Sequence, residues 1–218
     1  FRSHWGARTV AALVATPSNP TGTLLTAEEL QSMAQFVAER NGALIVDEIY
    51  HGLVYDGDAR TVLALRDDVF VINSFSKYFN MTGWRLGWMV VPDAYVAAID
   101  RLSQNIYLAA PTAGQYAGLA ALQPENLAIL DARAQEFKAR RDYLLPELRR
   151  LGFDIPVTPQ GAFYIYAGCA RLTNDSFALA RDLLEHAKVA ITPGADFGSN
   201  QAEKYVRFAY TNSIERLK

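Results

Sequence analysis

Three short apolar runs, each followed directly by polar residues, constrain the fold of this chain more than any other feature. They cover residues 10–16, 43–46 and 69–73, and a helical pattern over residues 26–41 separates the first two. Apolar runs of this length are typical of strands buried on both faces, and strands that alternate with helices indicate a parallel sheet covered by helices. The pattern therefore predicts an α/β fold with a mostly parallel sheet.

The rest of the chain adds a fourth strand and then changes character. The fourth strand is expected over residues 86–91, and its short connection to the third strand permits antiparallel pairing. Helical patterns follow over residues 93–105 and 111–122, and a long amphipathic helix is expected over residues 124–151. A helix over residues 176–187 lies among short strand-like runs, which predicts a smaller α+β domain. These runs cover residues 153–157, 162–167, 189–192 and 205–210.

Composition narrows the classes of partner. The chain has 218 residues, 50% of them hydrophobic, and a formal net charge of -2. Because acids and bases are mixed along it, the chain gives no indication of nucleic-acid or membrane binding. The single cysteine, Cys169, rules out an internal disulfide and favours a reducing compartment such as the cytoplasm. The three histidines, His4, His51 and His186, lack metal-ligand spacing, so no metal site is predicted.

The segment over residues 74–87 carries the most chemistry. It begins at the end of the third predicted strand and contains two hydroxyls, Ser74 and Ser76, an amine, Lys77, and a guanidinium, Arg85. The hydroxyls and the guanidinium together offer several hydrogen-bond donors and a positive charge, which suits a phosphate group. A lysine beside such a phosphate site is a candidate for imine formation with an aldehyde cofactor. Taken alone, such a segment is far more often a loop with a solvated lysine and a helix-capping serine, and only the other motifs of the chain favour the cofactor site.

Polar side chains also follow the first two predicted strands. Asn19 comes after the first strand, Asp47 ends the second and Lys77 follows the third. Ligands of open α/β sheets bind beyond the carboxyl ends of the strands, so we expect these side chains at one edge. The set suits pyridoxal 5′-phosphate (PLP), with its phosphate on the segment 74–87. Lys77 would form the imine, Asp47 would keep the ring nitrogen protonated, and Asn19 and Tyr50 would donate to the ring phenolate.

Six short motifs along the chain resemble those of the class I/II, fold-type I PLP-dependent aminotransferases. Their order and rough spacing match those of the family over essentially the whole chain. The motifs are Ser-Asn-Pro-Thr-Gly at 18–22, Asp-Glu-Ile-Tyr at 47–50, Ser-Phe-Ser-Lys at 74–77, Gly-Trp-Arg-Leu-Gly at 83–87, Gly-Ala-Phe-Tyr at 161–164 and Val-Arg-Phe-Ala at 206–209. One such motif would be a weak signal, but six in order are a specific one.

The resemblance implies a role for each matched residue. Lys77 would be the Schiff-base lysine and the proton carrier, Asp47 would pair with the ring nitrogen, and Tyr50 with the ring oxygen; these three would be the catalytic residues. Asn19 would contact the ring oxygen and the substrate, and Arg207 would bind the substrate α-carboxylate, with which a guanidinium forms a two-pronged pair. The implied reaction is transfer of an amino group between an amino acid and a 2-oxo acid, by an enzyme that is a homodimer.

The resemblance also implies an incomplete chain. In the family a substantial N-terminal portion precedes the first strand predicted here, and we expect this chain to be a fragment that lacks it. Residues 1–123 would then be the C-terminal portion of the large PLP-binding domain, and residues 124–218 the interdomain helix and the small C-terminal domain. The identity of the amino acid is not predicted, because part of the substrate pocket would come from the missing portion and a partner subunit.

Two other functions are compatible with the same motifs. A PLP-dependent C–S β-lyase would use the same fold and cofactor, because neither determines the reaction. A non-catalytic, aminotransferase-like sensing domain would also keep the cofactor site, although it would need a DNA-binding module upstream and none is visible in the sequence. Lys77, Asp47 and Arg207 are all present, which argues against loss of the site through mutation. Their presence is also compatible with a domain that binds the ligand without catalysing a reaction.

Overall fold

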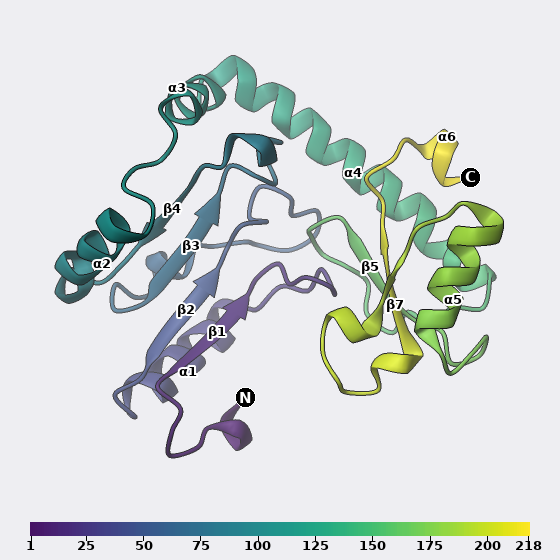
Figure 1. The fold of residues 1–218 in the computed structure, drawn as a ribbon, viewed down its shortest axis with the longest axis horizontal. Coiled ribbons are helices and arrows are strands. Elements are labelled where there is room, and N and C mark those ends of the chain that lie inside the picture. Colours follow the sequence, from purple (N-terminus) through teal and green to yellow (C-terminus); the bar gives the residue numbers. More distant parts are fainter.

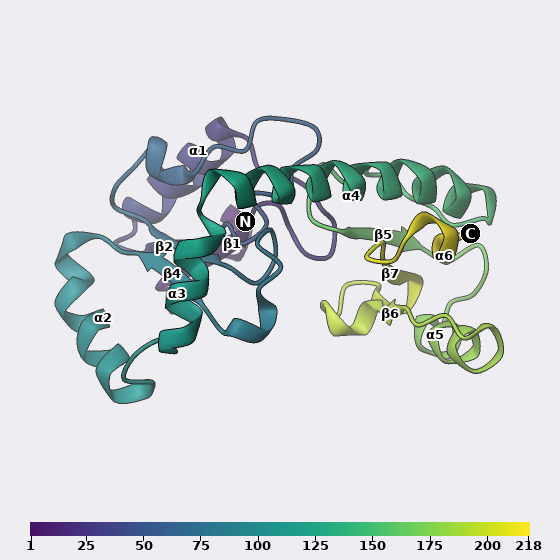
Figure 2. The ribbon, with the colours of Figure 1, turned by 90° about the horizontal axis from the view of Figure 1, so that it is seen from above.

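The chain folds into two β-sheets connected by one long helix (Figure 1, Figure 2). The computed structural model describes residues 1–218. The connecting helix is α4 (Pro124–Arg150), whose first half lies beside the larger sheet and whose second half lies beside the smaller one. Its long amphipathic pattern predicted this helix almost to the residue. None of the helices combines the length and the apolar character needed to cross a membrane.

The larger sheet has four strands in the order β1-β2-β3-β4. Strands β1 (Ala11–Ala15), β2 (Ala43–Asp47) and β3 (Phe70–Ser74) are parallel, whereas β4 (Gly87–Val90) runs antiparallel to β3. The α/β fold with a mostly parallel sheet is confirmed, and so is the antiparallel pairing of the third and fourth strands.

Helix α1 (Ala27–Ala38) packs on one face of this sheet. Thr26 and Glu29 form a capping box at its start, which satisfies backbone N–H groups that the helix leaves free. Its apolar side forms a core with the strands that includes Leu30, Val46 and Val71. The prediction that the first strand is buried on both faces is wrong, because Leu13 points away from α1 and is 64% exposed.

Helices α2 (Asp93–Ile106) and α3 (Thr112–Ala121) follow β4 and lie on its side of the sheet (Figure 1). Helix α2 buries none of its residues. Helix α3 buries two glycines, and a Cβ added to Gly114 would lie 2.8 Å from the carbonyl oxygen of Trp84. The absence of a side chain at Gly114 therefore lets α3 approach the segment that carries Arg85.

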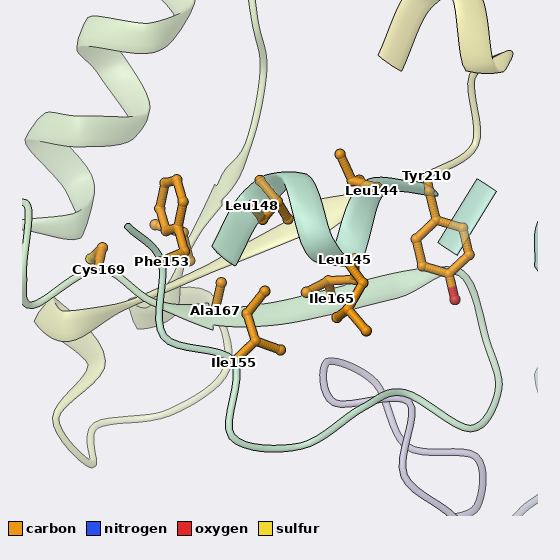
Figure 3. Close-up of a cluster of buried hydrophobic side chains, with 10 residues drawn as sticks. Leu144, Leu145, Leu148, Phe153, Ile155, Ile165, Ala167, Cys169 and Tyr210 are labelled. Atoms are coloured by element: carbon orange, nitrogen blue, oxygen red, sulfur yellow. The ribbon is translucent and has the colours of Figure 1, made fainter. Parts of the chain in front are cut away.

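The smaller sheet is antiparallel, in the order β5-β7-β6. Its strands are β5 (Tyr164–Gly168), β6 (Thr192–Pro193) and β7 (Tyr205–Ala209), accompanied by helices α5 (Ser176–Asp182) and α6 (Ile214–Leu217). The second half of α4 packs on this sheet, and its leucines form a core with β5 and β7 (Figure 3). Members of this core are Leu144, Leu145, Leu148, Ile165, Ala167, Val206 and Tyr210.

Two predicted strands are much shorter than expected. Residues 153–157 contribute a single antiparallel bridge, between Asp154 and Gly168. The run over residues 189–192 forms a strand only at Thr192–Pro193. Proline has no N–H to donate to a sheet, so Pro156 limits pairing of the first run after Asp154.

Candidate active site

The ends of three parallel strands bring most of the predicted site residues to one edge of the larger sheet. The register pairs Ala15 with Asp47 and Asp47 with Ile72, so β1, β2 and β3 end at nearly the same level. The loops that follow these strands point toward the smaller sheet (Figure 1). The site therefore lies where the two sheets face each other.

Asp47, at the end of β2, is a partly buried carboxylate. Burial raises its pKa above the usual value, and this effect exceeds the lowering caused by the Ile49 N–H and by the positive charge of Lys77. The Ile49 N–H donates to Asp47 Oδ1 at 3.0 Å. Because this carboxylate lacks full compensation in the chain itself, a cationic group placed against it would be stabilised.

Lys77 lies between aromatic rings just past β3. Its Nζ is 5.5 Å from the ring centroid of Tyr50 and 5.7 Å from that of Phe163. Phe163 belongs to the segment that enters β5, so the amine of Lys77 lies at the junction of the two sheets. Asp47 and Lys77 follow neighbouring strands of the sheet, and the positive charge of Lys77 lowers the pKa of Asp47.

Tyr50 is 4% exposed and lies among other aromatic residues. Its hydroxyl donates to the hydroxyl of Tyr164 at 3.3 Å, and its ring meets those of Phe163 and Tyr164 edge to face. Burial raises the pKa of Tyr50, and the neighbouring Tyr164 hydroxyl adds to this effect. The phenol therefore stays protonated at physiological pH, and its single O–H, donated here to Tyr164, would have to turn toward a ligand to bind it.

Arg207, on β7, connects the two sheets through Asn19. Its Nη1 donates to Asn19 Oδ1 at 2.8 Å, and its Nη2 donates to Thr192 Oγ1 at 3.3 Å. The guanidinium lies over the rings of Tyr164 and Phe197, at 4.0 and 4.7 Å from their centroids. Its Nε is buried and has no hydrogen-bond partner. Since none of these neighbours is an acid, the charge of Arg207 is available for a ligand carboxylate.

The predicted phosphate-binding residues form one hydrogen-bonded turn between β3 and β4. The Ser74 hydroxyl donates to the Leu86 carbonyl at 3.2 Å and accepts from the Ser76 N–H at 3.0 Å. Arg85 has a left-handed backbone, is exposed, and donates to the carbonyl of Thr82 at 2.9 Å. The structure thus places the hydroxyls and the guanidinium on one turn, while Arg85 makes no hydrogen bond with the other predicted site residues.

The chemistry of this donor set fits PLP. The cofactor has an aldehyde, a ring nitrogen that can be protonated, a phenolate oxygen and a phosphate. The chain offers an amine, a carboxylate with a raised pKa, a protonated phenol, and a turn with hydroxyls and a guanidinium. These groups are complementary in charge and in hydrogen bonding.

Residues 5–218 match the family described as aminotransferase class I and II. This chain is a member of that family. It is 42% identical over 200 residues to the valine–pyruvate aminotransferase of Mycobacterium tuberculosis, and the aligned region covers 91% of this chain and 52% of that protein. It is 33% identical to the aspartate aminotransferase of Thermotoga maritima, over 96% of this chain and 54% of that protein. The chain spans about half the length of the curated relatives it matches.

Solved structures of class I and II aminotransferases share the fold. An aminotransferase from Mycobacterium tuberculosis superimposes with a TM-score of 0.94 at 37% identity, over 99% of this chain and 56% of that one. The aspartate aminotransferase from Thermus thermophilus with maleate gives a TM-score of 0.90 at 33% identity, over 99% and 56% of the two chains. The family, the fold-type I architecture and the PLP cofactor that the motifs implied are thereby confirmed.

Several residues of the site were not assigned a role from the sequence. Phe163 and Tyr164 belong to the Gly-Ala-Phe-Tyr motif, and their aromatic pair directly before a strand was the available signal. Thr192 and Phe197 also contact Arg207, but no motif marks them. They reach the site only because β6 and the turn after it fold beside β7.

Proposed function

We propose that the intact protein transfers an amino group between an amino acid and a 2-oxo acid and uses PLP as its cofactor. The observation that carries the proposal is that Asn19, Asp47 and Lys77 follow three neighbouring strand ends at one sheet edge, where Asn19 accepts a hydrogen bond from Arg207 of the smaller sheet. The relatives support it, since they include a valine–pyruvate and an aspartate aminotransferase.

Each residue would have a distinct task. When bound, PLP supplies a protonated ring that withdraws electrons from the substrate α-carbon. Lys77 would hold the cofactor aldehyde and later carry the α-proton, a role that suits an amine surrounded by aromatic rings. Asp47 would keep the ring nitrogen protonated, and Tyr50 would donate to the ring oxygen together with Asn19.

The remaining residues would bind the two anionic ends. Ser74, Ser76 and Arg85 would hold the phosphate through hydroxyls and a guanidinium. Arg207 would bind the α-carboxylate of the substrate, and the rings of Tyr164 and Phe197 would keep the guanidinium in place. Asn19, already bonded to Arg207, would contact the same end of the substrate.

We further propose that the intact protein is a cytoplasmic homodimer. Exposed apolar side chains on and after β4 support a subunit interface, among them Trp88, Ile106 and Leu108. The cytoplasmic location rests on the single cysteine, Cys169, which is free and buried.

Replacement of Lys77 tests the proposed reaction in the intact protein. Lys77→Ala should abolish the visible absorbance of the bound cofactor and reduce amino transfer to a 2-oxo acid by about 10²–10⁴-fold, as expected for loss of a general acid–base group. Lys188→Ala removes an exposed lysine whose amine donates only to the carbonyl of Glu185, and it should leave both unchanged. An unchanged spectrum in Lys77→Ala would refute the assignment of Lys77. A second assay offers cystathionine to the wild-type protein with no 2-oxo acid added as amino acceptor, and release of pyruvate under this condition would favour a lyase.

A further inference from the structure

Arg141, on α4, is a buried arginine outside the site described above. It is only 3% exposed. Its Nη1 lies 2.6 Å from Asp56 Oδ2 and donates to the carbonyl of Pro159 at 2.6 Å. Its Nε and Nη2 donate to Asp142 Oδ1 at 2.9 and 2.7 Å. A buried charge is tolerated only when it is paired and hydrogen-bonded, so these contacts are needed to hold the guanidinium there.

The carbonyl that Arg141 holds belongs to the turn over residues 159–162, which lies between the two sheets. On one side, the N–H groups of Gln160 and Gly161 donate to the carbonyl of Gly22, at 2.8 and 3.0 Å. On the other side, the Tyr55 N–H donates to the Gln160 carbonyl at 2.8 Å, and the Ala162 N–H donates to the Leu53 carbonyl at 2.9 Å. The turn therefore contacts both the loop after β1 and the loop after β2.

These contacts bring the backbones so close together that no side chain fits at Gly161 or Gly22. A Cβ added to Gly161 would lie 2.6 Å from the carbonyl oxygen of Leu53, and one added to Gly22 would lie 2.6 Å from the carbonyl oxygen of Gly161. Tyr55, next to Asp56, also bonds to the carbonyl of Ala162 through its hydroxyl. Asp56, the partner of Arg141, thus lies on the same segment that holds the turn.

The turn leads directly into the aromatic residues of the site. Phe163 lies beside Lys77, and Tyr164 accepts the hydrogen bond of Tyr50 and lies under the guanidinium of Arg207. A displacement of the Pro159 carbonyl would therefore also displace Tyr164, which lies only five positions further along the chain and contacts Arg207.

We propose that Arg141 is a positioning residue for substrate binding. By holding Asp56 and the carbonyl of Pro159 at once, it sets the distance between the loop after β2 and the turn before β5, and so places Tyr164 and Arg207 against Tyr50. The proposal rests on the proposed function for its kinetic effect only. A lysine cannot replace Arg141, because its single ammonium lacks the planar fork that reaches three acceptors.

The test compares three variants of the intact protein with wild type. Arg141→Lys keeps the charge and removes the fork, and Asp56→Asn removes one charged partner. Arg149→Lys is the matched control, because Arg149 also lies on α4 and donates to a carbonyl, that of Ile155, at 3.0 Å but outside the turn. The first readout is amide hydrogen exchange at residues 160–162, and the second is the split between KM and kcat for an amino donor.

Arg141→Lys should speed exchange at residues 160–162 at least about tenfold and raise KM about tenfold, while kcat changes less than about threefold and the cofactor absorbance is unchanged. Asp56→Asn should change the exchange rate and KM in the same direction by a smaller factor. If Arg141→Lys does not fold, Asp56→Asn alone tests the proposal. Exchange and KM within twofold of wild type in both variants, or equal effects in Arg149→Lys, would overturn the proposal. A wild-type protein that is inactive with every amino donor would refute the proposed function instead. The positioning role of Arg141 would then be tested by amide hydrogen exchange at residues 160–162 alone.

Discussion

At the scale of single residues, the site contains two groups, Asp47 and Arg207, whose surroundings in the chain do not fully balance the charge that each has in water. Asp47 is a carboxylate that burial makes harder to ionise, and Arg207 is a guanidinium held by aromatic rings and neutral oxygens. Neither arrangement stabilises the chain on its own, because Arg207 has no acid beside it and the charge of Lys77 offsets only part of the effect of burial on Asp47. Both are explained if ligands supply the missing partners.

Replacement of Asp47 should separate stability from function. An acid whose pKa is raised on folding destabilises the folded state when ionised; the penalty is absent below the ordinary pKa and complete above the raised one. Asp47→Asn should therefore be at least as stable as wild type at pH 7 without cofactor, and this difference should shrink as the pH falls from the raised pKa toward about 4 and be absent below it. Thermal unfolding without PLP across this pH range measures the difference. A loss of stability at pH 7 in Asp47→Asn would contradict the assigned cause of the pKa shift.

Replacement of Arg207 should act on substrate binding. Arg207→Lys keeps the positive charge but loses the two-pronged geometry, at a cost of about 1.5–3 kcal/mol for a hydrogen bond to a charged group. KM for an amino acid should rise by about 10–100-fold, while binding of PLP, followed by its absorbance, should not change. The opposite pattern, weaker PLP binding with an unchanged KM, would place Arg207 in the cofactor site.

At the scale of elements, the loops after the strands are fitted to one another with little free space. Gly52, in the loop after β2, shows this fit most directly. A Cβ added to Gly52 would lie 2.1 Å from Cγ of Tyr78, the residue that follows Lys77. The hydroxyl of Tyr78 in turn donates to Asp131 on α4 at 2.5 Å. The position of Lys77 therefore depends on β2, β3 and α4 together.

Gly52→Ala should consequently disturb both folding and the site. The added methyl group must displace the ring of Tyr78, and such overpacking costs about 1–3 kcal/mol. The free energy of unfolding from a urea titration should fall by that amount. Gly6→Ala is the control, since nothing lies within 4 Å of a Cβ at Gly6 and its backbone conformation suits any residue. Equal stability of the two variants would show that Tyr78 moves aside without cost.

At the scale of the whole molecule, exposed apolar surface is distributed unevenly. Large apolar side chains are exposed throughout β4, α2 and α3, and Ile106 and Leu108 reach 73% and 82% exposure. Other members of this group are Trp84, Trp88, Met89, Val90, Tyr95, Val96, Leu102, Tyr107, Tyr116, Leu119 and Leu122. Contiguous exposed apolar surface on soluble proteins marks interaction sites or causes aggregation.

The 218-residue chain should therefore self-associate through this region. Paired replacements Ile106→Lys and Leu108→Lys should reduce its self-association and its binding of an apolar dye, with little change in the unfolding midpoint, because both side chains are solvated already. Sedimentation velocity measures the association. Leu172→Lys, an exposed leucine outside the region, serves as the control. If Leu172→Lys has the same effect, net charge rather than this region controls association.

The sequence by itself determined the alternation of strands and helices, and it identified Asn19, Asp47 and Lys77 as residues that follow successive strands. These signals are local: an apolar run, a periodicity of 3.6 or a motif can be read within a short window. The prediction over residues 153–157 failed because a local apolar run does not reveal whether a partner strand pairs with it, and here only Asp154 forms a bridge.

The tertiary structure decided which residues meet. The contact between Arg207 and Asn19 joins residues 188 positions apart, and Thr192 and Phe197 reach Arg207 through the fold of the smaller sheet. The helical spacing puts Arg141 on the same side of the long helix as Phe137 and Leu144, but the sequence does not show what would pair with a charge there, since charged residues are mostly exposed. Its burial depends on Asp56 and Pro159, which only the packing of the two sheets against α4 brings to it.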